Sequence, residues 1–146
     1  MLFRSTAAAV AAAEGLQVLL LEKAPLLGGT TAISGGMVWV PGNPKAATVG
    51  YPDDIETARA YLAQTVSGDH NAAAREVFLR EAAPAIAYLE RNTSVQLRPV
   101  PVYPDYYPDL PGASLGGRVL EPVPYDARAL GRHFALIQPP LPEFVL

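Results

Sequence analysis

The sequence predicts an α/β fold that contains the second half of a βαβ unit. Residues 7–14 are almost entirely alanine and valine, which favours a helix, and Gly15 follows where a helix commonly ends. Residues 17–22 form a short, mostly apolar run that ends in a carboxylate, as is typical of a parallel strand buried on both faces. A helix, a glycine and a buried strand in this order form the end of a βαβ unit.

The first strand of such a unit and its G-x-G-x-x-G turn would come before this helix. The chain begins inside the helix, and residues 2–5 resemble translated adapter sequence joined to the interior of a gene. We therefore expect residues 1–146 to form one incomplete nucleotide-binding domain that lacks its first strand and glycine turn. Residues 1–5 are a candidate non-native segment.

Residues 25–36 are expected to form a glycine-rich loop. Two glycine pairs lie within it, too much glycine for a regular element. Such a loop lets the backbone approach a ligand closely, although glycine pairs by themselves favour simple turns. A short apolar strand is expected at residues 37–40, where Pro41 closes it.

Two amphipathic helices are expected next, at residues 53–67 and 71–91. Asp53 or Asp54 can cap the first helix, and the asparagine at the start of the second can cap that one. Pro84 predicts a kink or a break in the second helix. The expected apolar faces are Ile55, Ala58, Leu62 and Val66 in the first helix and Val77, Phe78, Ile86 and Leu89 in the second.

The segment of residues 99–111 is expected to be an extended loop. It contains five prolines and three tyrosines, and proline at this density excludes a central strand or a helix interior. A glycine pair at residues 116–117 predicts a turn before a short apolar strand at residues 119–120. A last helix is expected at residues 126–137, capped by the aspartate at its start.

The composition excludes several classes of function. The net charge is −3 and the 11 basic residues are spread along the chain, so no nucleic-acid surface is expected. The chain has no cysteine and only two histidines, which excludes disulfides and argues against a metal site. Glu14 and Gln17 interrupt the N-terminal apolar stretch well short of the roughly 20 residues that span a bilayer, so no transmembrane segment is expected. We take the cytoplasm as the expected location.

Glu22 is the first candidate for binding chemistry, because it ends the predicted strand. Open α/β sheets bind ligands at this edge, and an acidic residue there accepts hydrogen bonds from ribose hydroxyls. The position alone is equally consistent with a solvated strand end. The order of the features favours a cofactor site: a strand, an acid, a basic residue, a proline, and two clusters of glycine and hydroxyl residues before an apolar strand.

Several motifs resemble one family of flavoproteins. Those in the first part of the chain are Glu22-Lys23-Ala24-Pro25, Gly28-Gly29-Thr30-Thr31-Ala32, Ser34-Gly35-Gly36 and Val38-Trp39-Val40-Pro41. They resemble the second-strand and flavin-loop region of the fumarate reductase and 3-ketosteroid Δ1-dehydrogenase flavoproteins. The later motifs resemble the ketosteroid dehydrogenase branch: Tyr103-Pro-Asp-Tyr-Tyr-Pro108, Pro111-Gly112, Gly116-Gly117-Arg118 and Glu121-Pro122. The proteins of this family are several times longer than the chain.

The resemblance implies FAD as the cofactor and a partial Rossmann-like FAD-binding domain with helical and proline-rich insertions. The substrate-side region would begin within residues 53–146. Glu22 would bind the adenosine ribose, and Lys23 and Ala24 would line the adenosine. The residues expected near the pyrophosphate and ribityl chain are Gly28, Gly29, Thr30 and Thr31, and those expected against the isoalloxazine are Ser34, Gly35 and Gly36.

The resemblance also implies a reaction, the removal of two hydrogens from adjacent ring carbons beside the 3-keto group of a steroid. In this family a tyrosine takes the proton and flavin N5 accepts the hydride. A tyrosine with an ordinary pKa of about 10 is a poor base at neutral pH unless neighbouring donors stabilise its phenolate. Tyr106, and after it Tyr107, would supply this assistance, and Tyr103 would line the steroid pocket. The base itself would lie beyond residue 146, so the chain is expected to be inactive alone.

Alternative interpretations remain at this point. A fumarate-reductase-like protein would share the glycine loops, and a plain NAD-binding protein would share the βαβ unit. The PxxP-like segments at residues 101–104 and 139–142 are also consistent with a non-enzymatic interaction module. Tyrosines in a proline-rich loop commonly serve as surface cover. Arg118 and Glu121 are expected to form a structural ion pair, and the electron acceptor is not identified.

Overall fold

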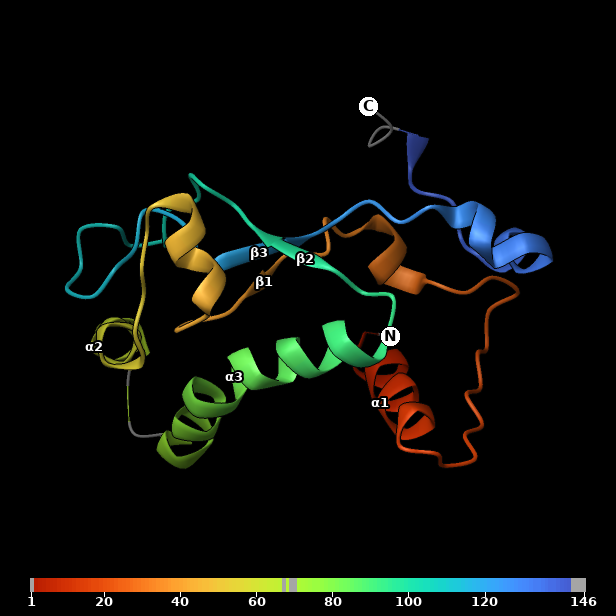
Figure 1. The fold of residues 1–146 in the computed structure, drawn as a ribbon, viewed down its shortest axis with the longest axis horizontal. Coiled ribbons are helices and arrows are strands. Elements are labelled where there is room, and N and C mark those ends of the chain that lie inside the picture. Colours follow the sequence, from red (N-terminus) through yellow and green to blue (C-terminus); the bar gives the residue numbers. More distant parts are fainter. Residues whose placement is uncertain (1, 67, 69–70, 143–146) are drawn as a thin grey trace. The chain divides into compact units, whose positions relative to one another are not determined.

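The computed structural model describes residues 2–66, 68 and 71–142. The chain divides into two compact units. Met1–Gly36 and Pro124–Leu146 form one, called here the terminal unit, and Met37–Val123 forms the other, called the central unit (Figure 1).

The terminal unit begins with helix α1, Leu2–Ala13, which confirms the helix predicted at residues 7–14 and also includes residues 2–6. Gly15 follows the helix with a φ of 81°, a left-handed conformation that glycine adopts without steric cost. A short 3-10 helix, Gly29–Ile33, lies in the glycine-rich loop. Leu27 just before it forms an isolated parallel bridge with Ile137.

The buried strand predicted at residues 17–22 is wrong. The segment is extended but forms no strand, and Leu19 and Leu21 are 82% and 75% exposed. A parallel strand needs a neighbouring strand for its hydrogen bonds and cover on both faces. Within the described residues no strand pairs with this segment, so the structure does not show the Rossmann-like part of the expected fold.

The last predicted helix is present in a different form. Ala127–Leu136 is 3-10 rather than α-helical, and Gly131 interrupts it with φ 51° and ψ −130°. Asp126 caps it as expected, accepting a hydrogen bond from the Arg128 amide. The guanidinium of Arg128 also pairs with Asp126 on the surface.

The central unit is built around a small antiparallel sheet. Its strands are β1, Val38–Trp39, β2, Leu97–Pro99, and β3, Val119–Pro122, in the order β1-β3-β2. The register pairs Trp39 with Val119 and Arg98 with Glu121. The strands at residues 37–40 and 119–120 were predicted from the sequence, whereas β2 was not.

Two α-helices complete the central unit with a 3-10 helix, Pro44–Val49. Helix α2, Ile55–Thr65, begins at an N-cap on Asp54, as predicted. Helix α3, Ala72–Asn92, continues through Pro84 without a break. The side-chain cap expected at Asn71 is wrong, because Asn71 adopts φ 61° and makes no capping hydrogen bond. The predicted end of the first helix at residue 67 lies outside the described residues, as do residues 69 and 70.

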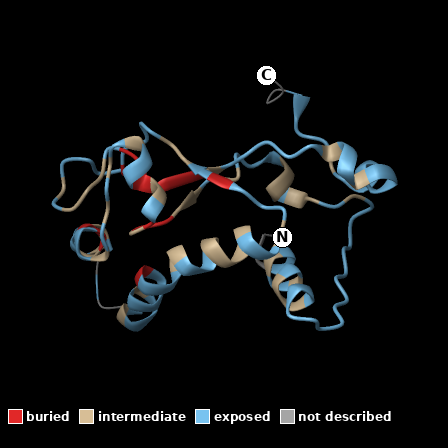
Figure 2. Cartoon of the chain, viewed as in Figure 1, coloured by how far each residue is buried: buried red, intermediate tan, exposed pale blue. Residues whose placement is uncertain are grey.

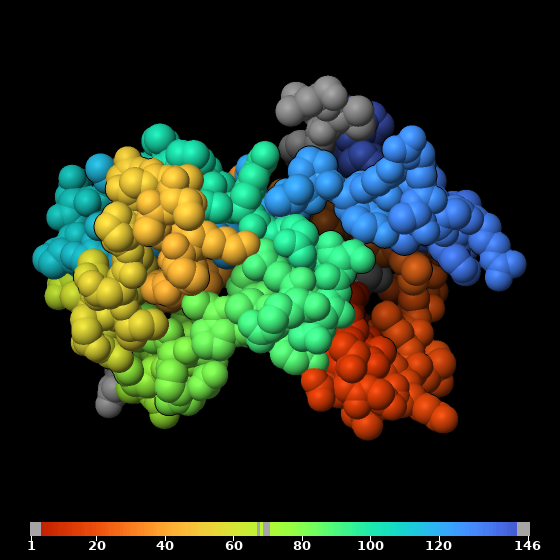
Figure 3. Space-filling model, viewed as in Figure 1, coloured from red at the N-terminus to blue at the C-terminus, as the bar shows by residue number. Residues whose placement is uncertain are grey.

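The core of the central unit lies between the sheet and α3. Val40, Leu97 and Leu120 are buried, and Figure 2 shows the buried residues concentrated along the strands. The partly buried residues packed against them are Val38, Ala82, Ala83 and Ile86. The apolar face predicted for α3 is right at Ile86 and at Phe78, whose ring stacks on that of Trp39 with centroids 6.0 Å apart, and wrong at Val77, which is exposed. Figure 3 shows α2 and the first part of α3 in contact.

Candidate functional site

The glycine-rich loop of the terminal unit borders a hollow of about 380 Å³. Three of the predicted cofactor residues, Glu22, Gly28 and Thr31, line it together. Its other lining residues are Arg4, Ser5, Leu20, Leu21, Leu27, Ala32 and Ile137. The remaining predicted cofactor residues are not in this lining: Lys23, Ala24, Gly29, Thr30, Ser34, Gly35 and Gly36.

The backbone at the start of the 3-10 helix requires glycine. Gly28 has a φ of 135°, and a Cβ placed on it would lie 2.8 Å from the Cβ of Ala32. The Gly28 carbonyl accepts a hydrogen bond from the Thr31 amide at 3.0 Å. The Leu27 amide and carbonyl bond to residues 136 and 138, which anchors the loop. A residue larger than glycine could therefore not adopt the backbone conformation of Gly28 at the border of the hollow.

The polar groups of this loop fit a nucleotide cofactor. Oε1 of Glu22 accepts a hydrogen bond from the Ala24 amide at 2.9 Å, and Oγ of Ser34 accepts one from the Gly36 amide at 3.1 Å. Both groups are exposed, so they lie where a ligand can reach them. A carboxylate suits ribose hydroxyls, and glycine amides with small hydroxyls suit phosphate.

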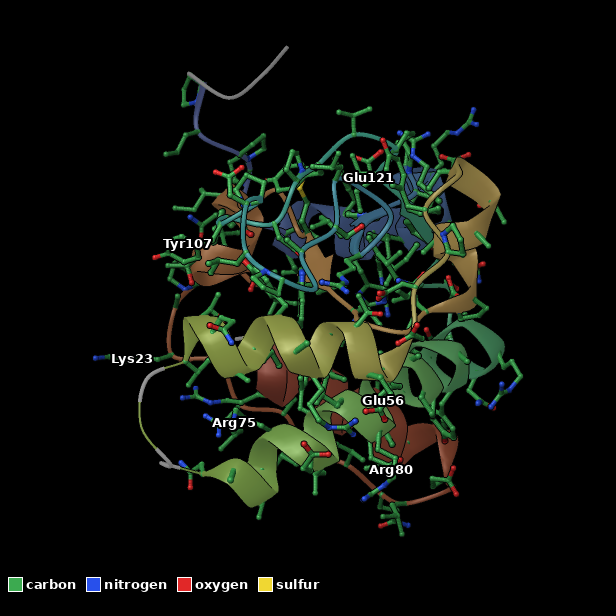
Figure 4. All side chains as sticks on the ribbon, turned by 90° about the vertical axis from the view of Figure 1, so that its left-hand side faces the viewer. Lys23, Glu56, Arg75, Arg80, Tyr107 and Glu121 are labelled. Carbon is green, nitrogen blue, oxygen red and sulfur yellow. The ribbon has the colours of Figure 1, made fainter. Side chains whose placement is uncertain are left out.

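A second hollow, of about 320 Å³, lies in the central unit. It brings together all three predicted tyrosines, Tyr103, Tyr106 and Tyr107. Tyr106 is 86% exposed and Tyr107 is 59% exposed. Figure 4 shows Tyr107 in the loop above α2, with Arg75 on α3 on the opposite side of that helix. The other lining residues are Met37, Val38, Trp39, Tyr61, Leu62, Thr65, Pro104, Asp105 and Val119.

A buried ion cluster contacts the loop of residues 99–111, which is called here the tyrosine loop. The Arg118 side chain is 1% exposed and binds Asp53 with two hydrogen bonds, Nε to Oδ2 at 2.9 Å and Nη2 to Oδ1 at 2.7 Å. Its Nη1 donates to Oδ2 of Asp105 at 2.7 Å and to the Gly112 carbonyl at 2.8 Å. Burial alone would lower the pKa of Arg118, but the hydrogen bond and charge of Asp53 and the charge of Asp105 outweigh burial and raise the pKa.

The predicted ion pair between Arg118 and Glu121 is wrong. Glu121 pairs instead with Arg98, Nε to Oε1 at 2.7 Å, in an exposed position. Residues separated by an odd number in extended chain point to opposite faces, which separates Arg118 from Glu121. The structural role expected for Arg118 is present, with other partners.

Trp39 and Tyr61 connect the ion cluster to the tyrosine loop. Nε1 of Trp39 donates to Oδ1 of Asp105 at 2.7 Å, and the Tyr107 amide donates to Oη of Tyr61 at 3.2 Å. The Arg118 guanidinium lies 5.7 Å from the centroid of the Trp39 ring and 5.9 Å from that of Tyr61.

Sequence reasoning missed Tyr61 and the roles of Asp53 and Asp105. The sequence indicates Asp53 only as a helix cap and Asp105 only as part of a motif. Two features of the sequence could have indicated the cluster. Asp105 lies inside a loop rich in tyrosine and proline, and Arg118 follows a glycine pair a few residues after that loop. Nothing in the sequence pairs these residues, because they lie far apart along the chain.

The comparison with known protein families assigns the chain to a class of flavin-binding proteins. The family model described as an FAD binding domain matches residues 5–140, and the chain belongs to this family. FAD is therefore the cofactor of this family of oxidoreductases, as predicted from the motifs.

The relatives found by sequence are dehydrogenases of ring ketones. The chain is 40% identical to a 3-oxosteroid 1-dehydrogenase of Mycobacterium tuberculosis, over 91% of this chain and 24% of that protein. It is 41% identical to a 4-oxocyclohex-2-ene-1-carboxylate 5-dehydrogenase of Sinomonas cyclohexanicum, over 96% of this chain and 23% of that protein. The chain thus spans about a quarter of the length of these relatives.

A solved structure shows the same relationship. The chain superimposes with a TM-score of 0.89 and 38% identity on the 3-ketosteroid Δ1-dehydrogenase of Sterolibacterium denitrificans in complex with 1,4-androstadiene-3,17-dione. The match covers 97% of this chain and 25% of that one. The resemblance to the ketosteroid dehydrogenase branch is confirmed, and the interaction-module alternative is not favoured. None of the described helices is long and apolar enough to cross a membrane.

Proposed function

We propose that the chain supplies the flavin-binding loop and one wall of the substrate site of an FAD-dependent dehydrogenase that acts on a 3-oxosteroid. The observation that carries the proposal is the hollow that gathers Tyr103, Tyr106 and Tyr107 in a chain of this family. The cytoplasmic location is part of the same proposal.

The cofactor roles follow the predicted positions. Glu22 would accept the ribose hydroxyls, with Lys23 and Ala24 along the adenosine. The loop residues near the pyrophosphate and ribityl chain would be Gly28, Gly29, Thr30 and Thr31, and those against the ring system would be Ser34, Gly35 and Gly36. The lining of the first hollow by Glu22, Gly28 and Thr31 supports this assignment. When bound, the flavin supplies the acceptor for the substrate hydride.

The tyrosine loop would act on the proton side of the reaction. Tyr106 would donate a hydrogen bond that stabilises the phenolate of a catalytic tyrosine outside this chain, with Tyr107 as the second candidate. Tyr103 would form part of the wall against the substrate ring. A positioned donor of this kind lowers the cost of forming the basic phenolate at neutral pH. The chain alone would be inactive, because it lacks the base.

The second hollow favours a neutral substrate over a ring carboxylate. Among its described lining residues none is a lysine or an arginine, and Asp105 there is already bound to Arg118. The guanidinium of Arg118 already binds two carboxylates, Asp53 and Asp105, so it is not available to bind a substrate carboxylate. A carboxylate in an apolar site needs a compensating charge or hydrogen bonds. This supports a steroid rather than the oxocyclohexane carboxylates of the Sinomonas relatives.

A chimera tests the proposal, with this chain replacing the matching quarter of the Sterolibacterium denitrificans enzyme. The purified chimera should be yellow, and its visible flavin band should bleach on adding a 3-oxosteroid without oxygen. Tyr106→Phe should lower the rate of bleaching roughly a hundredfold with flavin content unchanged. A colourless folded chimera would contradict the cofactor assignment, and a yellow chimera bleached only by 4-oxocyclohexanecarboxylate would overturn the steroid assignment.

A further inference from the structure

The backbone amides of every second residue between 103 and 107 bind this segment to neighbouring parts of the central unit. The bonds are Tyr103 N to Leu115 O (3.1 Å), Asp105 N to Ser114 O (2.9 Å) and Tyr107 N to Tyr61 Oη (3.2 Å). Asp105 is buried, whereas Tyr106 next to it is 86% exposed. Holding the Asp105 carboxylate therefore also holds the backbone from which the Tyr106 side chain departs.

Asp105 is held on both carboxylate oxygens. Oδ1 accepts from the Trp39 indole at 2.7 Å, and Oδ2 accepts from the Ser114 amide at 2.9 Å and from Arg118 at 2.7 Å. Arg118 is in turn fixed by Asp53, whose Oδ2 also accepts from the Gly42 amide at 2.8 Å. The chain of contacts runs from the start of α2 through a guanidinium to the tyrosine loop.

We propose that Arg118 is a positioning residue for the tyrosine loop: by joining Asp53 to Asp105 it fixes the direction in which Tyr106 leaves the loop. This inference rests on the proposed function, in which Tyr106 acts on the catalytic base. The planar guanidinium suits the task because it donates to Asp53, Asp105 and the Gly112 carbonyl at the same time. A lysine ammonium retains the charge but cannot span these three acceptors in one plane.

Amide hydrogen exchange of the chain Met1–Leu146 tests the positioning directly. In Arg118→Lys the amides of Tyr103, Asp105 and Tyr107 should exchange about tenfold faster or more, while the amides within the β2–β3 pairing keep their protection. Tyr61→Phe should accelerate exchange at the Tyr107 amide alone, because it removes only the hydroxyl that accepts this bond. Tyr61→Phe keeps the ring and its packing, so it serves as the reference for the loss of one loop contact alone.

Arg98→Lys is the matched control. Arg98 also pairs with a carboxylate through its guanidinium, but the pair is exposed and does not contact the tyrosine loop. It should leave the three loop amides unchanged. Two results in Arg118→Lys would overturn the proposal. Unchanged exchange of the loop amides would show that Arg118 does not hold the loop, and equal acceleration throughout the central unit would show that Arg118 stabilises the whole unit and not the loop in particular.

Activity of the chimera separates this inference from the proposed function. Arg118→Lys should lower kcat for the 3-oxosteroid about tenfold with little change in KM and with full flavin content, because the substrate wall is kept and the proton-side group is misplaced. A normal kcat in Arg118→Lys, in a chimera that Tyr106→Phe still inactivates, would reject the positioning role and keep the proposed function. If Tyr106→Phe has no effect, the proposed function itself fails.

Discussion

At the scale of single residues, Gly112 shows how closely the tyrosine- and proline-rich loop approaches α2. Gly112 has a φ of 80°, and a Cβ on it would lie 2.2 Å from the carbonyl oxygen of Thr57 and 2.8 Å from the Tyr61 amide nitrogen. The Gly112 carbonyl also accepts a hydrogen bond from Arg118. A side chain at this position would push the loop away from both the helix and the ion cluster.

We therefore expect Gly112→Ala to destabilise the chain by about 3 kcal/mol, from backbone strain and steric overlap together. Gly50→Ala is the matched control, because Gly50 has a similar φ of 88° but a Cβ at this position would meet nothing within 4 Å. It should cost only the strain, about 1 kcal/mol. Urea unfolding followed by fluorescence of Trp39 measures both, and equal losses would contradict the close approach.

The contact that Glu90 makes between α3 and β2 is expected to weaken in acid. Its Oε1 accepts from Nζ of Lys45 at 2.5 Å and from the Leu97 amide at 2.8 Å. Burial alone would raise the pKa of Glu90, but these hydrogen bonds and the charge of Lys45 hold the pKa below its ordinary value of 4.5.

Because the pKa of Glu90 is lower in the folded chain, its carboxylate stabilises the fold above the unfolded pKa, and this stability is lost as the pH falls through the folded pKa. The wild-type chain should thus be more stable than Glu90→Gln at pH 7, and the difference should shrink as the pH falls below 4.5. Urea midpoints measured between neutral and acidic pH check this. A difference independent of pH would show that the charge of Glu90 is not the cause.

At the scale of elements, the two α-helices of the central unit begin differently. Asp54 precedes α2 with a β-region backbone, and its Oδ1 accepts from the Thr57 amide at 2.7 Å. That hydrogen bond lowers the pKa of Asp54. Asn71 precedes α3 in a left-handed conformation and makes no capping bond. Asparagine serves there because it tolerates positive φ, not because it caps.

Asp54→Ala should destabilise the chain by about 1 kcal/mol, the usual cost of a lost N-cap. Asn71→Gly is the comparison, and it should change the stability by no more than about 0.5 kcal/mol, because glycine accepts the φ of 61° and no side-chain bond is lost. Thermal unfolding followed by circular dichroism measures both. A larger loss at Asn71 than at Asp54 would contradict the assignment of the caps.

At the scale of the whole molecule, the two units differ in how their apolar residues are used. The central unit has a buried cluster of Val40, Leu97 and Leu120, and no buried side-chain nitrogen or oxygen among the described residues lacks a hydrogen-bond partner. In the terminal unit, by contrast, the leucines of residues 16–21 are exposed. The central unit thus has the features of a structure that is stable by itself.

We expect Met37–Val123 alone to unfold cooperatively, with a midpoint close to that of the central unit in the whole chain. The reason is that its core, its sheet and the Arg118 cluster are formed by residues within it. Trp39 is the only tryptophan and lies in this unit, so its fluorescence reports the transition in both proteins. A non-cooperative transition in Met37–Val123 would show that its stability depends on the terminal unit.

The local features and the family could be predicted from the sequence. Alanine content and glycine position predicted α1, an aspartate at residue 53 or 54 predicted the start of α2, and proline density predicted the irregular tyrosine loop. Each of these depends on the conformational preferences of nearby residues. The glycine and tyrosine motifs identified the flavoprotein family, which the matching domain confirms.

The partners of Arg118 and the conformation of residues 17–22 could not be predicted, because they depend on contacts between distant segments. Arg118 meets Asp53 and Asp105 because the sheet and the loops bring distant segments together, and no periodicity in the sequence records that contact. Residues 17–22 have the composition of a buried strand, but hydrogen bonds between strands and cover on both faces must come from other segments. A strand is a property of a sheet, and in the described residues this segment has no sheet to join.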